Sequence, residues 1–254
     1  MDSLLLEYGW LGMPLLAMLA AAIALVPLGQ QVLARGVVFI DLAVAQVAAC
    51  GALAVAVWID HPSAWQASIG AGAAALSGAG LVWWLARSWP AQREALIGLV
   101  YVAGASVAMV AAAWDPHGRE RLTALLAADV LWAAPAPTLW LGTLAVAVAA
   151  LALARRAALA ADGLFYPLFA LTLSAAVPVL GLYLVFAFLI APALWTRRNV
   201  RLGTACALGF VAAVGGLALS WLLDWPSGAC VATALSLAGL ASAVRPPGAG
   251  TAPC

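Results

Sequence analysis

An acidic residue, Asp41, lies inside a long apolar stretch of the chain, and Gln46 follows five positions later. The other residues of 37–50 are apolar. An ionised side chain at bilayer depth costs at least about 2.5–3.5 kcal/mol, so such residues usually face a bundle interior or an aqueous pathway. If this stretch crosses a membrane, Asp41 and Gln46 are candidates to line a hydrophilic path for a cation.

Helix geometry decides whether the two groups act together. In a regular helix that starts near Arg35, Asp41 lies about 9 Å from that end and Gln46 about 16 Å. Gln46 and Cys50 share a face, whereas Asp41 and Gln46 are separated by about 140°. A π-bulge between them would bring them into line. The alternative is that Asp41 reaches the membrane surface and Gln46 bonds a neighbouring helix.

A second polar group, Asp115, His117 and Glu120, follows an apolar segment. Imidazole and carboxylate are ligand types that suit a divalent transition metal, which makes His117 and Glu120 metal candidates. The alternatives are an ordinary solvated loop or a docking site for a partner. Nucleotide hydrolysis has no support, because no GxxxxGK[ST] run occurs in the chain.

The composition predicts that membrane helices position these groups, because 67% of the residues are hydrophobic and only 8% are charged. We expect an all-α, polytopic helical bundle forming one transmembrane domain over residues 1–254, with 11–244 in membrane segments and 245–254 as a tail. The first apolar segment is expected to be retained, because acids stand where a signal peptide carries basic residues. Eight or nine crossings are arguable from the apolar segments 11–33, 37–59, 65–86, 94–114, 138–154, 164–178, 180–195, 201–223 and 226–244.

The arginines predict the orientation. Most of them fall at alternate junctions between the apolar segments, whereas the other junctions carry acids. The positive-inside rule makes the arginine-rich junctions cytoplasmic, so the N-terminus is expected outside and the C-terminus inside. This orientation requires nine passages, or a re-entrant element that counts as one. The cytoplasmic set is Arg35, Arg87, Arg93, Arg155, Arg156, Arg197, Arg198, Arg201 and Arg245.

Two segments are expected to depart from simple spans. Residues 164–195 are too many for one ordinary span, and Pro178 with Gly181 predicts a break, either as a hairpin or as a broken helix near a substrate route. Residues 122–132 follow the polar outer loop and are expected to form a short helix that lies in the interface or dips into the bundle.

Five sequence motifs, in their order and spacing, resemble one family: the membrane permease subunits of metal-ion ABC importers of the zinc and manganese type. The resemblance runs from about Leu28 to Arg245. It rests on GVVFID at 36–41, ALIGL at 95–99, LAADVL at 126–131, Gly181 followed by IAPA at 190–193, and DWPSG at 224–228. The resemblance implies a transport subunit that holds no cofactor and is not itself an enzyme.

The resemblance also implies a role for the second apolar segment, which in this family carries an acid and, four residues on, a histidine that both meet the metal. Asp41 resembles the acid, whereas Gln46 stands in place of the histidine. An amide oxygen is a poorer zinc ligand than imidazole. The family implies transport of zinc or manganese, and in this chain the binding site for that ion is therefore expected to differ from the usual one.

Partners follow from the same resemblance. An ABC ATPase subunit is implied beneath the cytoplasmic loops, a solute-binding protein outside, and a second permease chain across the path in the inner membrane. Family members usually have a longer cytoplasmic loop than residues 157–163, so we expect the ATPase to dock also on neighbouring arginines: Arg155, Arg156, Arg197 and Arg198. The net charge of +1 implies no nucleic-acid partner.

Two other classes of protein fit the sequence. One is an ion-coupled secondary carrier in which Asp41 binds and releases a proton or a sodium ion. The other is a membrane anchor subunit with no path of its own, in which Asp41 is structural. Co-purification with an ATPase subunit separates the importer from both alternatives.

Overall fold

The computed structural model describes residues 11–59, 63–113, 118–126 and 128–244, and in these ranges it contains helices and no strand. Nine helices of 15 to 25 residues form the bundle. Their bounds are α2 Gly12–Arg35, α3 Ile40–Trp58, α4 Ala64–Ser88, α5 Arg93–Ala113, α7 Pro135–Ala154, α9 Asp162–Leu180, α10 Leu182–Thr196, α11 Leu202–Leu223 and α12 Ser227–Val244. Four shorter elements join them: η2 Pro90–Gln92, α6 Gly118–Leu126, η3 Val130–Trp132 and α8 Arg156–Ala160.

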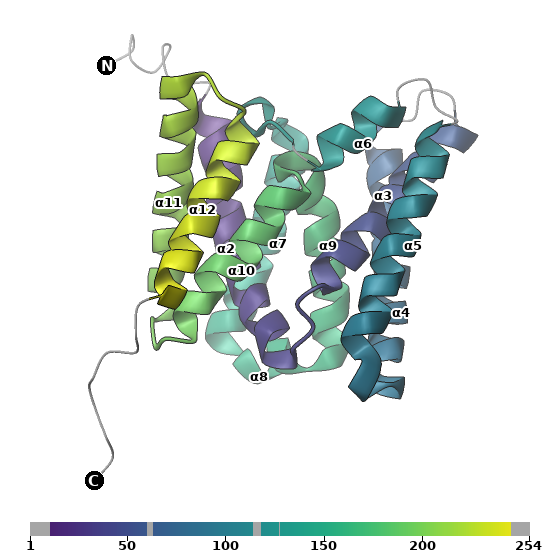
Figure 1. Ribbon diagram of the computed structural model, residues 1–254, viewed down its shortest axis with the longest axis horizontal. Coiled ribbons are helices and arrows are strands. Elements are labelled where there is room, and N and C mark those ends of the chain that lie inside the picture. Colours follow the sequence, from purple (N-terminus) through teal and green to yellow (C-terminus); the bar gives the residue numbers. More distant parts are fainter. Residues whose placement is uncertain (1–10, 60–62, 114–117, 127, 245–254) are drawn as a thin grey trace.

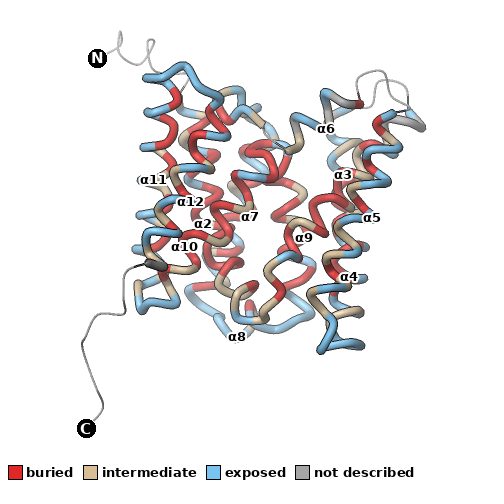
Figure 2. Tube along the Cα trace, in the orientation of Figure 1, coloured by how far each residue is buried: buried red, intermediate tan, exposed pale blue. Residues whose placement is uncertain are grey.

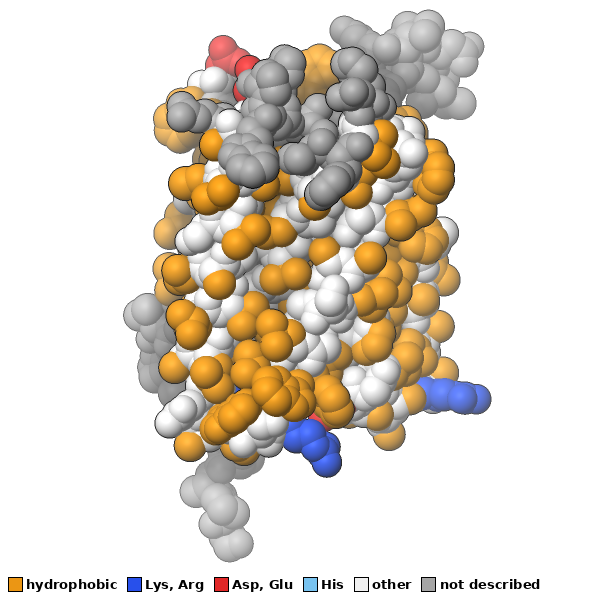
Figure 3. All heavy atoms as spheres, turned by 90° about the vertical axis from the view of Figure 1, so that its right-hand side faces the viewer, with side chains coloured by type: hydrophobic (Ala, Val, Ile, Leu, Met, Phe, Trp, Pro, Cys, Tyr) orange, Lys and Arg blue, Asp and Glu red, His pale blue; other side chains and the backbone are white. Residues whose placement is uncertain are grey.

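The bundle has the composition of a multi-pass membrane protein. Six helices (α2, α4, α5, α7, α9 and α11) are long and apolar enough to cross a bilayer, and α3, α10 and α12 contain shorter apolar stretches. Seen from the side of α4 and α5, apolar side chains cover the face, and arginines lie at its lower end (Figure 3). The prediction of an all-α polytopic bundle is confirmed.

The helices divide into a central group and two flanks. Figure 1 shows α2, α7, α9 and α10 between a flank of α11 and α12 and a flank of α3, α4 and α5. In the most apolar stretch of each helix, 67% of the residues of α2 and 61% of those of α9 are buried. In α5 only 17% are buried (Figure 2). The core is therefore built around α2 and α9, and α5 presents most of its surface outward.

Small residues let the central helices approach one another closely. A Cβ added at Gly29 of α2 would lie 1.8 Å from the carbonyl oxygen of Leu189 in α10. A Cβ at Gly51 of α3 would lie 2.4 Å from the carbonyl oxygen of Gly70 in α4. Glycine at such contacts allows two backbones to pack directly, as is common between membrane helices.

Two glycines end helices where the chain must turn. Gly36 adopts the left-handed conformation (φ 62°, ψ 41°), and its N–H bonds back to the carbonyls of Leu33 and Val32, which terminates α2. Gly181 (φ 77°, ψ 154°) separates α9 from α10. The predicted break in residues 164–195 is confirmed, and Figure 1 shows the two helices diverging from this point.

Two sequence expectations differ from the structure. Residues 122–132 do not form one helix, because α6 ends at Leu126 and η3 begins at Val130. The side chain of Asp129 accepts the Leu131 N–H at 3.1 Å and also accepts the hydroxyl of Ser227, so it starts η3 and ties it to α12. Segment 157–163 likewise contains most of a short helix, α8, which was not predicted from the sequence.

Candidate functional site

Asp41 lies in the first turn of α3, directly after the turn that connects it to α2. Its side chain is completely buried (0% exposed), and neither carboxylate oxygen has a hydrogen-bond partner among the described residues. Asp41 is therefore enclosed by the bundle and is not exposed on its outer surface. A buried polar group without a partner is unusual in a folded protein and calls for an explanation.

The position of Asp41 depends on a second acid, Glu94, at the start of α5. Glu94 accepts the backbone N–H of Val38 at 3.2 Å through Oε1, while its Oε2 is buried without a partner among the described residues. This bond fixes the turn just before α3 begins. Glu94 was not predicted from the sequence as a site residue, although an acid at the start of an apolar segment was the available signal.

Gln46 lies one and a half turns further along α3 and faces α5. Its side chain is buried (5% exposed), and a Cβ added at Gly104 of α5 would lie 3.2 Å from the Gln46 Cβ. On the next turn, the Cys50 thiol donates to the Gly104 carbonyl at 3.1 Å. Gln46 and Cys50 thus share a face that packs on α5.

The structure does not bring Asp41 and Gln46 together within one chain. Residues 40–58 form a regular α-helix without a π-bulge, so the two side chains point about 140° apart. Along the helix axis they are separated by about 7.5 Å. A single ion cannot be held by both groups of one protomer in this conformation.

The outer polar group is only partly described. Glu120 is exposed in the first turn of α6, whereas Asp115 and His117 lie outside the described residues. Within the described ranges, no group of three or more His, Cys, Asp or Glu residues is arranged to hold a metal ion. The assignment of Glu120 and His117 as metal ligands remains a prediction from the sequence.

The four arginines predicted to dock an ATPase, Arg155, Arg156, Arg197 and Arg198, are all exposed. They lie where α7 passes into α8 and where α10 ends. Arg156 donates through Nε to the Ala152 carbonyl at 3.2 Å, and Arg197 donates to the Leu33 carbonyl in the last turn of α2. This second bond places the end of α10 beside the end of α2.

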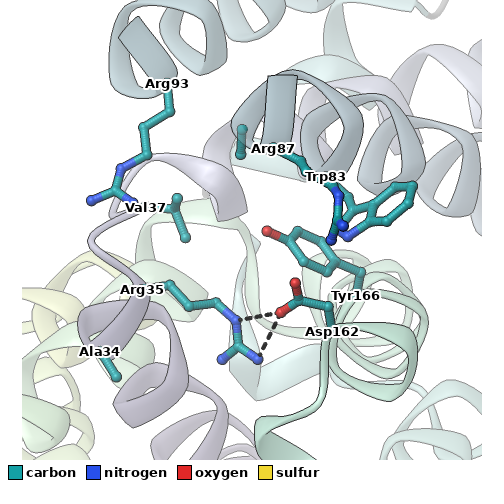
Figure 4. A pocket seen from close by; sticks show the side chains of 9 residues that line it. Ala34, Arg35, Val37, Trp83, Arg87, Arg93, Asp162 and Tyr166 are labelled. Atoms are coloured by element: carbon teal, nitrogen blue, oxygen red, sulfur yellow. Dashed lines mark hydrogen bonds and ion pairs between the residues drawn. The ribbon is translucent and has the colours of Figure 1, made fainter. Parts of the chain in front are cut away.

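Arg35, at the end of α2, has a very different environment from Asp41. It forms an ion pair with Asp162 at 3.3 Å and donates to the Ala160 carbonyl at 2.6 Å. It also donates to Gln31 Oε1 at 3.0 Å, and its guanidinium lies 3.9 Å from the ring centroid of Phe165. The pair with Asp162 joins α2 to the start of α9 (Figure 4).

Comparison with known proteins gives one family and one fold. Residues 158–245 match the model of the ABC 3 transport family. A solved structure of PsaBC from Streptococcus pneumoniae, in complex with a Fab, shares the fold with a TM-score of 0.72 and 16% sequence identity, over 96% of this chain and 94% of that chain. None of the curated proteins matches the sequence significantly.

Proposed function

We propose that this chain, whose residues 158–245 match the model of the ABC 3 transport family, is the membrane permease subunit of an ATP-driven importer for divalent metal ions. The observation that carries the proposal is Asp41: a carboxylate that is completely buried in an apolar helix and has no partner among the described residues. Leaving such a group unsatisfied costs about 1–3 kcal/mol, and more if it is charged. A passing cation would supply the missing partner.

The donor atoms support manganese over zinc as the cargo. Asp41 offers carboxylate oxygens and Gln46 an amide oxygen, and oxygen donors suit hard ions such as Mn²⁺, whereas zinc sites prefer imidazole and thiolate. Because the two side chains are about 140° apart on one regular helix, they are proposed to meet the ion in succession. A path between two permease chains would allow each chain to present its groups in turn.

The proposed membrane topology has nine passages, formed by α2, α3, α4, α5, α7, α9, α10, α11 and α12. The end of the bundle that carries Arg35, Arg155 and Arg197 is assigned to the cytoplasm of an inner-membrane protein by the positive-inside rule. There the ATPase subunit is proposed to dock on α8 and on the exposed arginines beside it. The opposite end, with α6 and Glu120, is proposed to receive the solute-binding protein.

Reconstitution tests this proposal directly. The chain is expressed with its ATPase subunit, purified as a complex, and placed in proteoliposomes with the solute-binding protein. Mn²⁺ and Zn²⁺ are then compared for stimulation of ATP hydrolysis and for uptake. We expect Mn²⁺ to give the larger response.

The alternative outcomes are distinct. If the chain does not co-purify with an ATPase subunit, the importer assignment fails, and a proton- or sodium-coupled carrier using Asp41 is tested next. If it co-purifies but no divalent ion stimulates hydrolysis, the importer assignment survives and the metal cargo is wrong. If Zn²⁺ is the better substrate, the argument from oxygen donors is wrong.

A further inference from the structure

A cavity of about 360 Å³ opens at the arginine-rich end of the bundle, and neither Asp41 nor Gln46 lines it. It lies where α2, α4, α5 and α9 meet, and Figure 4 shows its side chains. The lining residues are Ala34, Arg35, Val37, Trp83, Ala86, Arg87, Arg93, Asp162 and Tyr166. Nothing in the proposed transport of a metal ion uses this cavity.

The charges of the cavity select an anion. Three arginines and a single carboxylate line the cavity, and that carboxylate, Asp162, is already paired with Arg35. Within the described residues, Arg87 and Arg93 form no ion pair. A divalent cation would be repelled here, whereas a phosphate group would find two arginines with unused donors, the side chain best suited to phosphate recognition.

Glu94 does not cancel this charge from the neighbouring turn. Its Oε1 accepts the Val38 N–H, it is not among the residues that line the cavity, and it forms no ion pair with an arginine within the described ranges. The hydroxyl of Tyr166 points into the space between the arginines and adds a further donor (Figure 4).

The position of the cavity indicates where the phosphate comes from. Trp83 lines the cavity and is also 38% exposed, and its neighbour Trp84 is 51% exposed. Tryptophan side chains concentrate at the level of the lipid headgroups, so the cavity rim lies at that level. Basic pockets between membrane helices on the cytoplasmic side bind anionic headgroups.

We propose that the cavity between α2, α4, α5 and α9 binds the phosphate group of an anionic phospholipid from the cytoplasmic leaflet, held by Arg87 and Arg93. Arg35 serves mainly to fix the wall between α2 and α9, because its donors are taken up by Asp162, Ala160 and Gln31. The bound lipid would link α4 and α5 of the flank to the central helices. The proposal is independent of which ion is carried.

Native mass spectrometry of the purified complex tests the proposal. The complex is titrated with phosphatidylglycerol or with phosphatidylcholine, and the retained lipid is counted. Wild-type protein is expected to retain phosphatidylglycerol preferentially. Removing one arginine should weaken retention of phosphatidylglycerol about fivefold. The double variant R87Q/R93Q should therefore retain it about 25-fold more weakly than the wild type. R201Q, which changes an exposed arginine outside the cavity, should retain the lipid like the wild type.

Two further arms make the result decisive. R87K/R93K keeps both charges and should retain most of the binding, which distinguishes lost charge from misfolding. Inorganic phosphate, added at millimolar concentration, should not displace the lipid. Equal retention by R87Q/R93Q and the wild type would overturn the proposal. Complete displacement by inorganic phosphate would also overturn it and would identify a site for soluble phosphate instead.

Discussion

Arg35 and Asp41 stand at the two ends of the turn that joins α2 to α3, yet their surroundings are opposite. Arg35 has an ion pair with Asp162, hydrogen bonds to Ala160 and Gln31, and the ring of Phe165 beneath it. Asp41 is more deeply buried, and its two oxygens have no partner among the described residues. Each is an ionisable group in an apolar protein, but only Arg35 is satisfied by its neighbours.

The difference separates a structural role from a functional one. The contacts of Arg35 join α2 to the start of α9, so its charge contributes to the fold. The burial of Asp41 opposes folding, because a buried carboxylate without a side-chain or solvent partner loses its hydration. Proteins retain such local costs mainly at functional sites. The comparison therefore supports the proposed role of Asp41 in binding the transported ion, and it indicates a structural role for Arg35.

The largest effect is expected for Asp41→Asn, which removes the charge and keeps the shape of the side chain. Uptake of the metal should fall to the background of liposomes without protein, because the ion loses its carboxylate ligand. The free energy of unfolding should stay the same or rise by about 1–3 kcal/mol, because a charge without a partner is gone. Uptake by proteoliposomes and thermal unfolding of the same preparation measure the two quantities.

Asp162→Asn is the matched control for this experiment, because it neutralises an acid that lies outside the apolar interior. It should leave uptake nearly unchanged. Normal uptake by Asp41→Asn would refute the role of Asp41, and a large loss of stability in that variant would show that the carboxylate is structural after all.

The next effect is expected for Arg35→Ala, which removes the ion pair, the hydrogen bonds and the contact with Phe165. Since the side chain is largely buried, we expect a loss of about 2 kcal/mol in the free energy of unfolding. Uptake should fall only in proportion to the amount of folded protein. Unfolding by denaturant in detergent micelles measures the first quantity, and uptake normalised to folded protein measures the second.

Arg35→Lys sharpens this test. A lysine keeps the charge but cannot reproduce the planar fork that reaches Asp162, Ala160 and Gln31 together. Its stability should therefore lie between that of the wild type and that of Arg35→Ala. If Arg35→Ala instead abolishes uptake by folded protein, Arg35 belongs to the transport machinery and the contrast with Asp41 disappears.

Most of the fold could be predicted from the sequence, because the apolar segments and their charged or Pro-rich breaks are local signals. Each of the nine expected segments overlaps a helix of the bundle. Gly181 interrupts 164–195 as predicted, whereas Pro178 lies within α9. The break at Asp129 was not predictable in the same way, because it depends on a hydrogen bond to Ser227, far along the chain.

The site was less predictable than the fold. Sequence position alone identified Asp41 as an acid in an apolar segment, but its complete burial depends on how α3 packs in the bundle. The bond between Glu94 and Val38 joins residues 56 positions apart, so no local pattern shows it. The cavity formed by Arg35, Arg87 and Arg93 similarly arises only when α2, α4 and α5 meet.

The smallest effect is expected for Glu94→Ala, which removes the hydrogen bond to Val38 in the turn between Arg35 and Asp41. Loss of the acceptor for the Val38 N–H should lower the free energy of unfolding by about 1 kcal/mol. Uptake should fall by a few fold and not to background, because Asp41 remains but the start of α3 is less well fixed. Glu94→Gln retains an oxygen acceptor for Val38 and should recover most of the uptake. If Glu94→Gln is as inactive as Asp41→Asn, the charge of Glu94 matters in its own right, and the buried Oε2 belongs to the ion path together with Asp41.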